Sequence, residues 1–76
     1  MSNDEKRKFK NFQKVVVPNF LINGNRMDVS CNVQRYIYNY TDRKWLVEVI
    51  INEVYLQLPE ERLVDYNEYW SNKNGN

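Results

Sequence analysis

The sequence from Phe12 to Leu58 has the composition of β-strands almost throughout, and short polar turns divide it. β-Branched and aromatic residues are frequent in this stretch, and such residues favour strands over helices. The pair Asn23-Gly24 interrupts it. Asn-Gly between two apolar runs is the strongest short signal for a β-hairpin. We therefore expect the chain to build an antiparallel sheet.

Three strands are expected in this region. The first contains Pro18, and we expect that strand at an edge of the sheet because proline cannot donate a ladder hydrogen bond. A polar turn at residues 41–44 joins the second strand to the third. The strands are expected over residues 12–22, 27–40 and 45–58.

The predicted register between the second and third strands places apolar residues on both faces of the sheet. If Tyr40 pairs with Trp45, the apolar alternation changes face near Gln34 and, in the partner strand, near Asn52. Two explanations remain open. Paired β-bulges bend the sheet so that all apolar residues share one face, or the ribbon is straight and has an apolar patch on each side. We favour paired bulges because both strands switch at the same level.

The C-terminal part of the sequence predicts one helix. Pro59 stops the third strand and suits the first position of a helix. The following segment, from Glu60 to Trp70, places Leu63 and Tyr66 on one helical face with Trp70. The predicted fold class is therefore α+β: a three-stranded antiparallel β-meander with one C-terminal α-helix (βββα).

The chain is short and has few residues that could cross-link it. Its 76 residues include one cysteine, Cys31, and no histidine, so neither an internal disulfide nor a Cys/His zinc site can form. We expect no metal and no other cofactor. The predicted organisation is a disordered basic arm over residues 1–10, a single domain over residues 11–71 and a frayed tail over residues 72–76.

The sequence offers little for catalysis. Histidine, the commonest general base, is missing. Two glycines, Gly24 and Gly75, cannot form a glycine-rich phosphate loop. Cys31 lies in an alternating strand pattern, which is typical of a buried thiol rather than a reactive one. We therefore expect a binding protein and not an enzyme.

The sequence also bears on where the protein acts. Its N-terminus is charged and has no apolar segment of a secretory signal. No apolar run approaches the roughly 20 residues of a membrane span, and a single cysteine suits a reducing compartment. We expect a cytoplasmic, intracellular protein without membrane contact. Abundant Asn, Lys, Ile and Tyr, with no alanine, suggest AT-rich codons and a viral or mobile-element origin.

One segment has the composition of a nucleic-acid-binding arm. Residues 6–14 contain five cations, two aromatic residues and no acid. Cations neutralise phosphates, and aromatic rings stack on bases. Removal of residues 1–10 is expected to weaken such binding and leave the fold intact. The candidate nucleic-acid contacts are Lys6, Arg7, Lys8, Phe9, Lys10, Lys14, Arg35, Arg43 and Lys44.

The stretch YIYNY supports a second hypothesis. Its tyrosines, Tyr36, Tyr38 and Tyr40, alternate and therefore face one side of a strand, and Trp45 follows the next turn. Tyrosine and tryptophan suit surfaces that are partly apolar and partly wet, so these four are candidate interface residues. The other interpretation is that the helix packs on them as core.

Two functions therefore remain open. The first is nucleic-acid contact through the basic arm and the cationic face of the sheet. The second is a protein-binding adaptor or inhibitor, including a homodimer, that uses the tyrosines. The position of the rings relative to the cations distinguishes the two.

Overall fold

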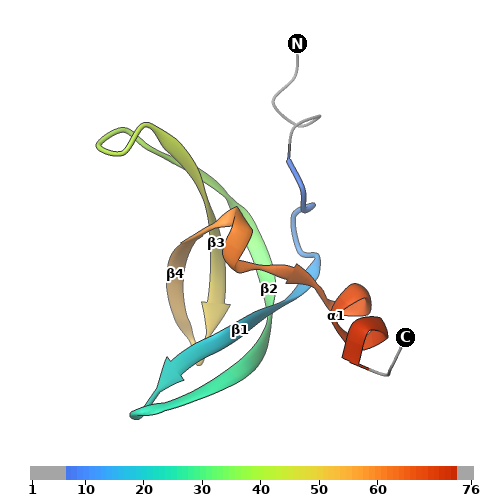
Figure 1. Ribbon diagram of the computed structural model, residues 1–76. Helices are drawn as coiled ribbons and strands as arrows, with labels where there is room; N and C mark the ends of the chain where they lie inside the picture. Colours follow the sequence, from blue (N-terminus) through green and yellow to red (C-terminus); the bar gives the residue numbers. More distant parts are fainter. Residues whose placement is uncertain (1–6, 74–76) are drawn as a thin grey trace.

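The computed structural model describes residues 7–73, which form an α+β fold around one curved antiparallel sheet (Figure 1). The strand order is β4-β3-β2-β1-β5. The predicted class, with an antiparallel sheet and one C-terminal helix, is confirmed, whereas the predicted number of strands is wrong because the sheet has five. The elements are β1 (Lys14–Ile22), β2 (Asn25–Asn39), β3 (Lys44–Ile51), β4 (Val54–Pro59), the 3-10 turn η2 (Glu60–Arg62), β5 (Val64–Asp65) and α1 (Tyr66–Lys73).

The β1–β2 hairpin turns at Asn23-Gly24, as predicted. Both residues have positive φ, 51° and 82°, which asparagine and glycine tolerate better than other residues. Ile22 and Asn25 pair on either side of the turn. The turn therefore follows from local sequence alone.

Pro18 does not mark an edge strand, because β1 lies between β2 and β5. The proline instead sits at an irregularity, where the pairing with β2 shifts between Val17 and Phe20 and Asn19 takes a φ of 56°. The short strand β5 ends its pairing with β1 at Val16. The missing N–H of Pro18 therefore interrupts no regular ladder, which is the usual way that a sheet accommodates proline at a bulge.

The predicted third strand is two strands, β3 and β4, joined by a turn at Asn52 and Glu53. These residues have φ values of 53° and 67°, as in the two-residue hairpin turns whose twist matches that of their strands. The change of face near Asn52 is therefore a chain reversal and not a bulge. The bulge predicted near Gln34 is present, since the β2–β3 pairing shifts between Val33 and Arg35.

The turn between β2 and β3 begins one residue earlier than predicted, which changes the register at the tyrosines. Tyr38 pairs with Trp45, and Tyr36 pairs with Val47, so the predicted pairing of Tyr40 with Trp45 is wrong. Tyr40 instead belongs to the turn that joins β2 to β3.

The predicted helix from residue 60 onward is wrong in its first half. After η2 the chain extends, Leu63 turns into the core, and Val64 and Asp65 pair with β1. Burial of Leu63, which is 1% exposed, outweighs the weak helical preference of this segment. The helix starts only at Tyr66, where the Asp65 carboxylate accepts a hydrogen bond from the backbone N–H of Glu68 at 3.1 Å and caps it.

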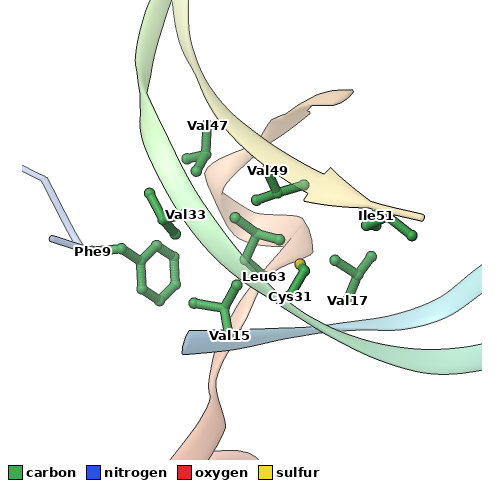
Figure 2. Close-up of a cluster of buried hydrophobic side chains, with 9 residues drawn as sticks. All are labelled: Phe9, Val15, Val17, Cys31, Val33, Val47, Val49, Ile51 and Leu63. Atoms are coloured by element: carbon green, nitrogen blue, oxygen red, sulfur yellow. The ribbon is translucent and has the colours of Figure 1, made fainter. Parts of the chain in front are cut away.

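The core occupies the concave face of the sheet, called the inner face below (Figure 2). Phe9 belongs to it at 2% exposure, although the sequence placed this residue in a disordered arm. The structure thus packs residues 7–10 of that arm against the sheet, while residues 1–6 lie outside the described residues, as do residues 74–76 of the predicted tail. The core residues are Phe9, Val15, Val17, Cys31, Val33, Val47, Val49, Ile51 and Leu63.

Helix α1 lies against β1 and β5 and has no buried residue. The Lys14 ammonium lies 4.3 Å from the centre of the Tyr66 ring. The Tyr69 hydroxyl donates a hydrogen bond to the Asp28 carboxylate, which lowers the pKa of Asp28 and raises that of Tyr69. The alternative interpretation of the β2 tyrosines required the helix to pack on them, and the helix does not cover them.

Within residues 7–73, no helix combines the length and apolar character needed to cross a membrane.

Candidate functional site

An aromatic cluster lies on the inner face, where the β2–β3 hairpin extends past the core. The Tyr38 ring meets the Tyr40 ring edge-on, with centroids 4.9 Å apart, and meets the Trp45 ring in the same way at 5.2 Å. Tyr40 is 83% exposed and Trp45 is 41% exposed. We call Tyr38, Tyr40 and Trp45 the aromatic surface. Its rings hold one another in place and still present open faces and edges to solvent.

Arg7 brings a cation from the N-terminal segment to this surface. Its guanidinium carbon lies 5.0 Å from the centre of the Tyr36 ring and 5.6 Å from the centre of the Trp45 ring. Both distances fall within the range of a cation–π interaction. The arm and the tyrosines, which the sequence suggested for two different functions, therefore meet on one face.

Tyr36 ties the N-terminal segment to the rest of the fold. Its hydroxyl accepts a hydrogen bond from the backbone N–H of Phe9 at 3.1 Å and donates one to the Glu60 carboxylate. Glu60 also accepts the backbone N–H of Lys8 at 2.8 Å. Burial and the Glu60 contact raise the pKa of Tyr36 to about 12. The Tyr36 side chain therefore packs against the core, and its hydroxyl holds the N-terminal segment that carries Arg7 in place.

A hollow of about 460 Å³ runs along this N-terminal segment. Of the six described residues that line it, three are cations and none is an acid. A backbone turn shapes one side of the hollow, because the Gln13 side chain accepts the N–H of Lys10 at 2.9 Å and donates to Asp65 at 2.7 Å. We call it the basic hollow; Arg7, Lys8, Phe9, Lys10, Asn11 and Gln13 line it.

Two further predicted cations, Arg43 and Lys44, lie at the tip of the β2–β3 hairpin, next to the aromatic surface. The Asn39 side chain holds this turn by accepting the backbone N–H of Thr41 at 2.9 Å and that of Asp42 at 3.2 Å. Arg43 takes a φ of 56° within the turn. Both cationic side chains are exposed.

The remaining candidate residues lie elsewhere. Phe9 is buried, so its ring cannot stack on a ligand. Lys14 lies against Tyr66 of α1, and Arg35 is on the opposite, outer face of the sheet, where its Nε donates to the Glu48 carboxylate at 3.0 Å. Lys6 lies outside the described residues. The structure thus places Arg7 against the rings, and Lys8 and Lys10 in the hollow beside it. Arg43 lies in the hairpin turn. Lys44 alternates with Trp45 along β3 and therefore points to the outer face, while Lys14 and Arg35 also lie apart from the rings.

Two exposed rings on the outer face were missed from the sequence. Phe12 is 71% exposed and Tyr55 is 58% exposed. The sequence predicts both residues within strands, Phe12 in the first and Tyr55 in the third. In the structure, Phe12 lies in a turn before β1, and Tyr55 follows the turn that precedes β4. The alternation of Tyr55 with Val54 and Leu56 gave the only signal.

The described residues contain no group of three or more cysteine and carboxylate side chains placed to hold a metal ion. Comparison with family models, curated proteins and solved structures finds no match to this chain.

Proposed function

We propose that this protein binds single-stranded nucleic acid across the aromatic surface and the basic hollow. The observation that carries the proposal is the position of Arg7, whose guanidinium lies over Trp45 and Tyr36. Arg7 thus links the cations of the basic hollow to the exposed rings of the aromatic surface. Bases stack on aromatic and guanidinium planes, and phosphates are neutralised by cations, which is the combination used by single-strand-binding proteins.

The form of the surface favours a single strand over a duplex. Rings can stack on bases only when the bases are unpaired and splayed out. The Tyr40 ring stands at a hairpin turn and is open to such a base. Duplex readers usually place a helix or ribbon in a groove, but α1 here is short, carries Glu68, and lies away from the aromatic surface.

The cations around the rings favour an anionic partner over a protein. Lys8 and Lys10 line the hollow with Arg7, while Arg43 lies in the turn of the hairpin that carries the rings. Stable protein interfaces are depleted of lysine in their contact core. The protein-binding hypothesis uses the same tyrosines, so the experiment below includes it as an outcome.

The test is fluorescence anisotropy with a labelled oligothymidylate of about 16 nucleotides, the upper site size of many single-strand binders. Tyr40→Ala should weaken binding by about 1–3 kcal/mol, the usual value of one stacked base, with an unchanged thermal melt because the ring is exposed. Trp70→Leu removes an exposed aromatic residue on α1 and should bind as the wild type does. Absence of binding at low salt would refute the proposal. A dimer in sedimentation that Tyr40→Ala dissociates would favour the homodimer instead.

The salt dependence tests the role of the cations separately. For single strands, the logarithm of the affinity falls with the logarithm of salt concentration by about 0.7 for each neutralised phosphate. A Lys8→Gln/Lys10→Gln variant should therefore reduce that slope by about 1.4. Arg26→Gln removes an exposed cation from the distant β1–β2 hairpin and should leave the slope unchanged.

Trp45 provides a direct report of stacking. In a Trp70→Phe variant, all tryptophan fluorescence comes from Trp45, since the sequence has two tryptophans. A base that stacks on the aromatic surface should quench this emission in proportion to binding. Anisotropy changes without quenching would place the nucleic acid elsewhere on the protein.

A further inference from the structure

A second hollow, of about 410 Å³, lies on the outer face of the sheet. Two exposed rings border it, Phe12 from the N-terminal segment and Tyr55 from β4. Glu48 and Arg35 lie between them, paired across the β2–β3 ladder. We call it the outer hollow; Phe12, Gln34, Arg35, Glu48 and Tyr55 line it.

The floor of the outer hollow holds Arg35 in a fixed orientation. Glu48 is 6% exposed, and its carboxylate oxygens accept hydrogen bonds from Arg35 Nε at 3.0 Å and from Gln57 Nε2 at 2.8 Å. The Arg35 side chain nevertheless remains 66% exposed. Because Nε is engaged by Glu48, the two terminal nitrogens of the guanidinium are left as a fork that can bind a phosphate.

The Phe12 ring is held outward by its backbone. Phe12 has a φ of 68°, which is uncommon for a bulky residue. Hydrogen bonds on both sides of the residue maintain this conformation: its N–H donates to the Val33 carbonyl at 2.6 Å, and its carbonyl accepts from the Asn32 side chain at 3.2 Å. Left-handed backbone that the surrounding structure fixes is typical of functional positions.

The N-terminal segment connects the two faces of the sheet. Arg7 lies on the aromatic surface of the inner face, Phe12 borders the outer hollow, and the basic hollow follows the residues between them. These five residue steps span at most about 18 Å. A path lined by Lys8 and Lys10 thus leads from one pair of exposed rings to the other.

From this continuity we infer that a bound single strand crosses the N-terminal segment and places a base in the outer hollow, between Phe12 and Tyr55, with its phosphate on Arg35. The inference rests on the proposed function and extends it. The aromatic surface binds one part of the strand, the basic hollow carries the backbone over the edge of the sheet, and the outer hollow binds the next part.

The test compares labelled oligothymidylates of about 4, 8 and 16 nucleotides, which cover the usual range of site sizes. Phe12→Asn removes the ring but suits the left-handed backbone, and Tyr55→Thr removes the other ring while keeping a strand-forming residue. Each should weaken binding of the longest oligonucleotide by roughly 5- to 150-fold, the loss of one stacked base. Each should change binding of the shortest by less than about twofold, because the aromatic surface alone binds it.

Leu21→Thr is the matched control, since Leu21 is an exposed apolar residue of β1 that lines neither hollow. It should bind every length as the wild type does. If both ring variants bind all lengths with wild-type affinity, the inference is overturned and the proposed function stands. If the wild type binds none of the oligonucleotides at low salt, the proposed function and this inference are both overturned. Thermal melts of the variants establish that each is folded.

Discussion

Phe9 gives the sharpest test of the fold, because the structure makes it core and the sequence had placed it in a dispensable arm. Phe9 is 2% exposed and contributes to the main apolar cluster (Figure 2). Truncation of a buried phenylalanine to alanine costs about 3–5 kcal/mol. A chain of 76 residues has a total stability of about 4–11 kcal/mol. Phe9→Ala should therefore remove a large part of the free energy of unfolding.

Phe12 supplies a matched control in the same segment. It is 71% exposed, so Phe12→Asn should lower the free energy of unfolding by no more than about 0.5 kcal/mol. Deletion of residues 1–10 also removes Phe9, so it should lower the free energy of unfolding by at least as much as Phe9→Ala does, in contrast to the expectation from sequence.

The assay is urea unfolding followed by tryptophan fluorescence and circular dichroism. The midpoint should fall for Phe9→Ala with little change in slope. In thermal melts the midpoint should fall by at least about 12 °C, at about 4 °C or more for each kcal/mol in a domain of this size. Coincident melts of Phe9→Ala and the wild type would show that residue 9 does not belong to the core.

Three further predictions follow from other parts of the structure. Glu53→Gly should raise the free energy of unfolding by up to about 1 kcal/mol, because Glu53 has a φ of 67° and left-handed backbone disfavours a side chain. The control, Glu68→Gly in α1, should lower it by about 1 kcal/mol. Equal changes in the free energy of unfolding at both positions, measured by chemical denaturation, would contradict the turn geometry. Burial raises the pKa of the Cys31 thiol to about 11, so a disulfide reagent at pH 8 should label this thiol only as fast as the fold opens, and immediate labelling of the native protein would show that it is accessible. The pKa of Tyr36 is raised to about 12 in the folded state from 10; its neutral form therefore stabilises the fold fully below pH 10, and this stabilisation is lost as the pH rises from 10 towards 12. The fall in urea midpoint across that range should be smaller in Tyr36→Phe, and an identical fall in both proteins would refute the assignment.

Local sequence determined those features that depend on a few adjacent residues. The Asn23-Gly24 turn follows from two residues that tolerate positive φ. The strand character of the central region follows from its composition. The start of α1 was also encoded locally, since Asp65 followed by Glu68 is a capping pattern, although the stronger apolar spacing from Leu63 obscured it.

The bulge at Gln34 was visible in the sequence, but the pairing that surrounds it was not. A change of face in the apolar alternation can arise from a bulge or from a chain reversal, and the same change marked Gln34 and Asn52. At Asn52 the chain reverses direction, because Glu53 takes a left-handed conformation that no local preference predicts. The register at Trp45 then depends on which residues form the turn between β2 and β3.

Tertiary structure alone decided which side chains are buried and which are open for binding. Leu63 leaves a helical pattern because a curved sheet has an open side that an apolar residue must fill. Phe9 and Phe12 stand three positions apart in one polar segment, yet the first completes the core and the second faces solvent. The sheet brings Arg7 to Trp45 and keeps Arg35 on the opposite face. These arrangements depend on contacts between residues distant in the chain, which a local pattern does not contain.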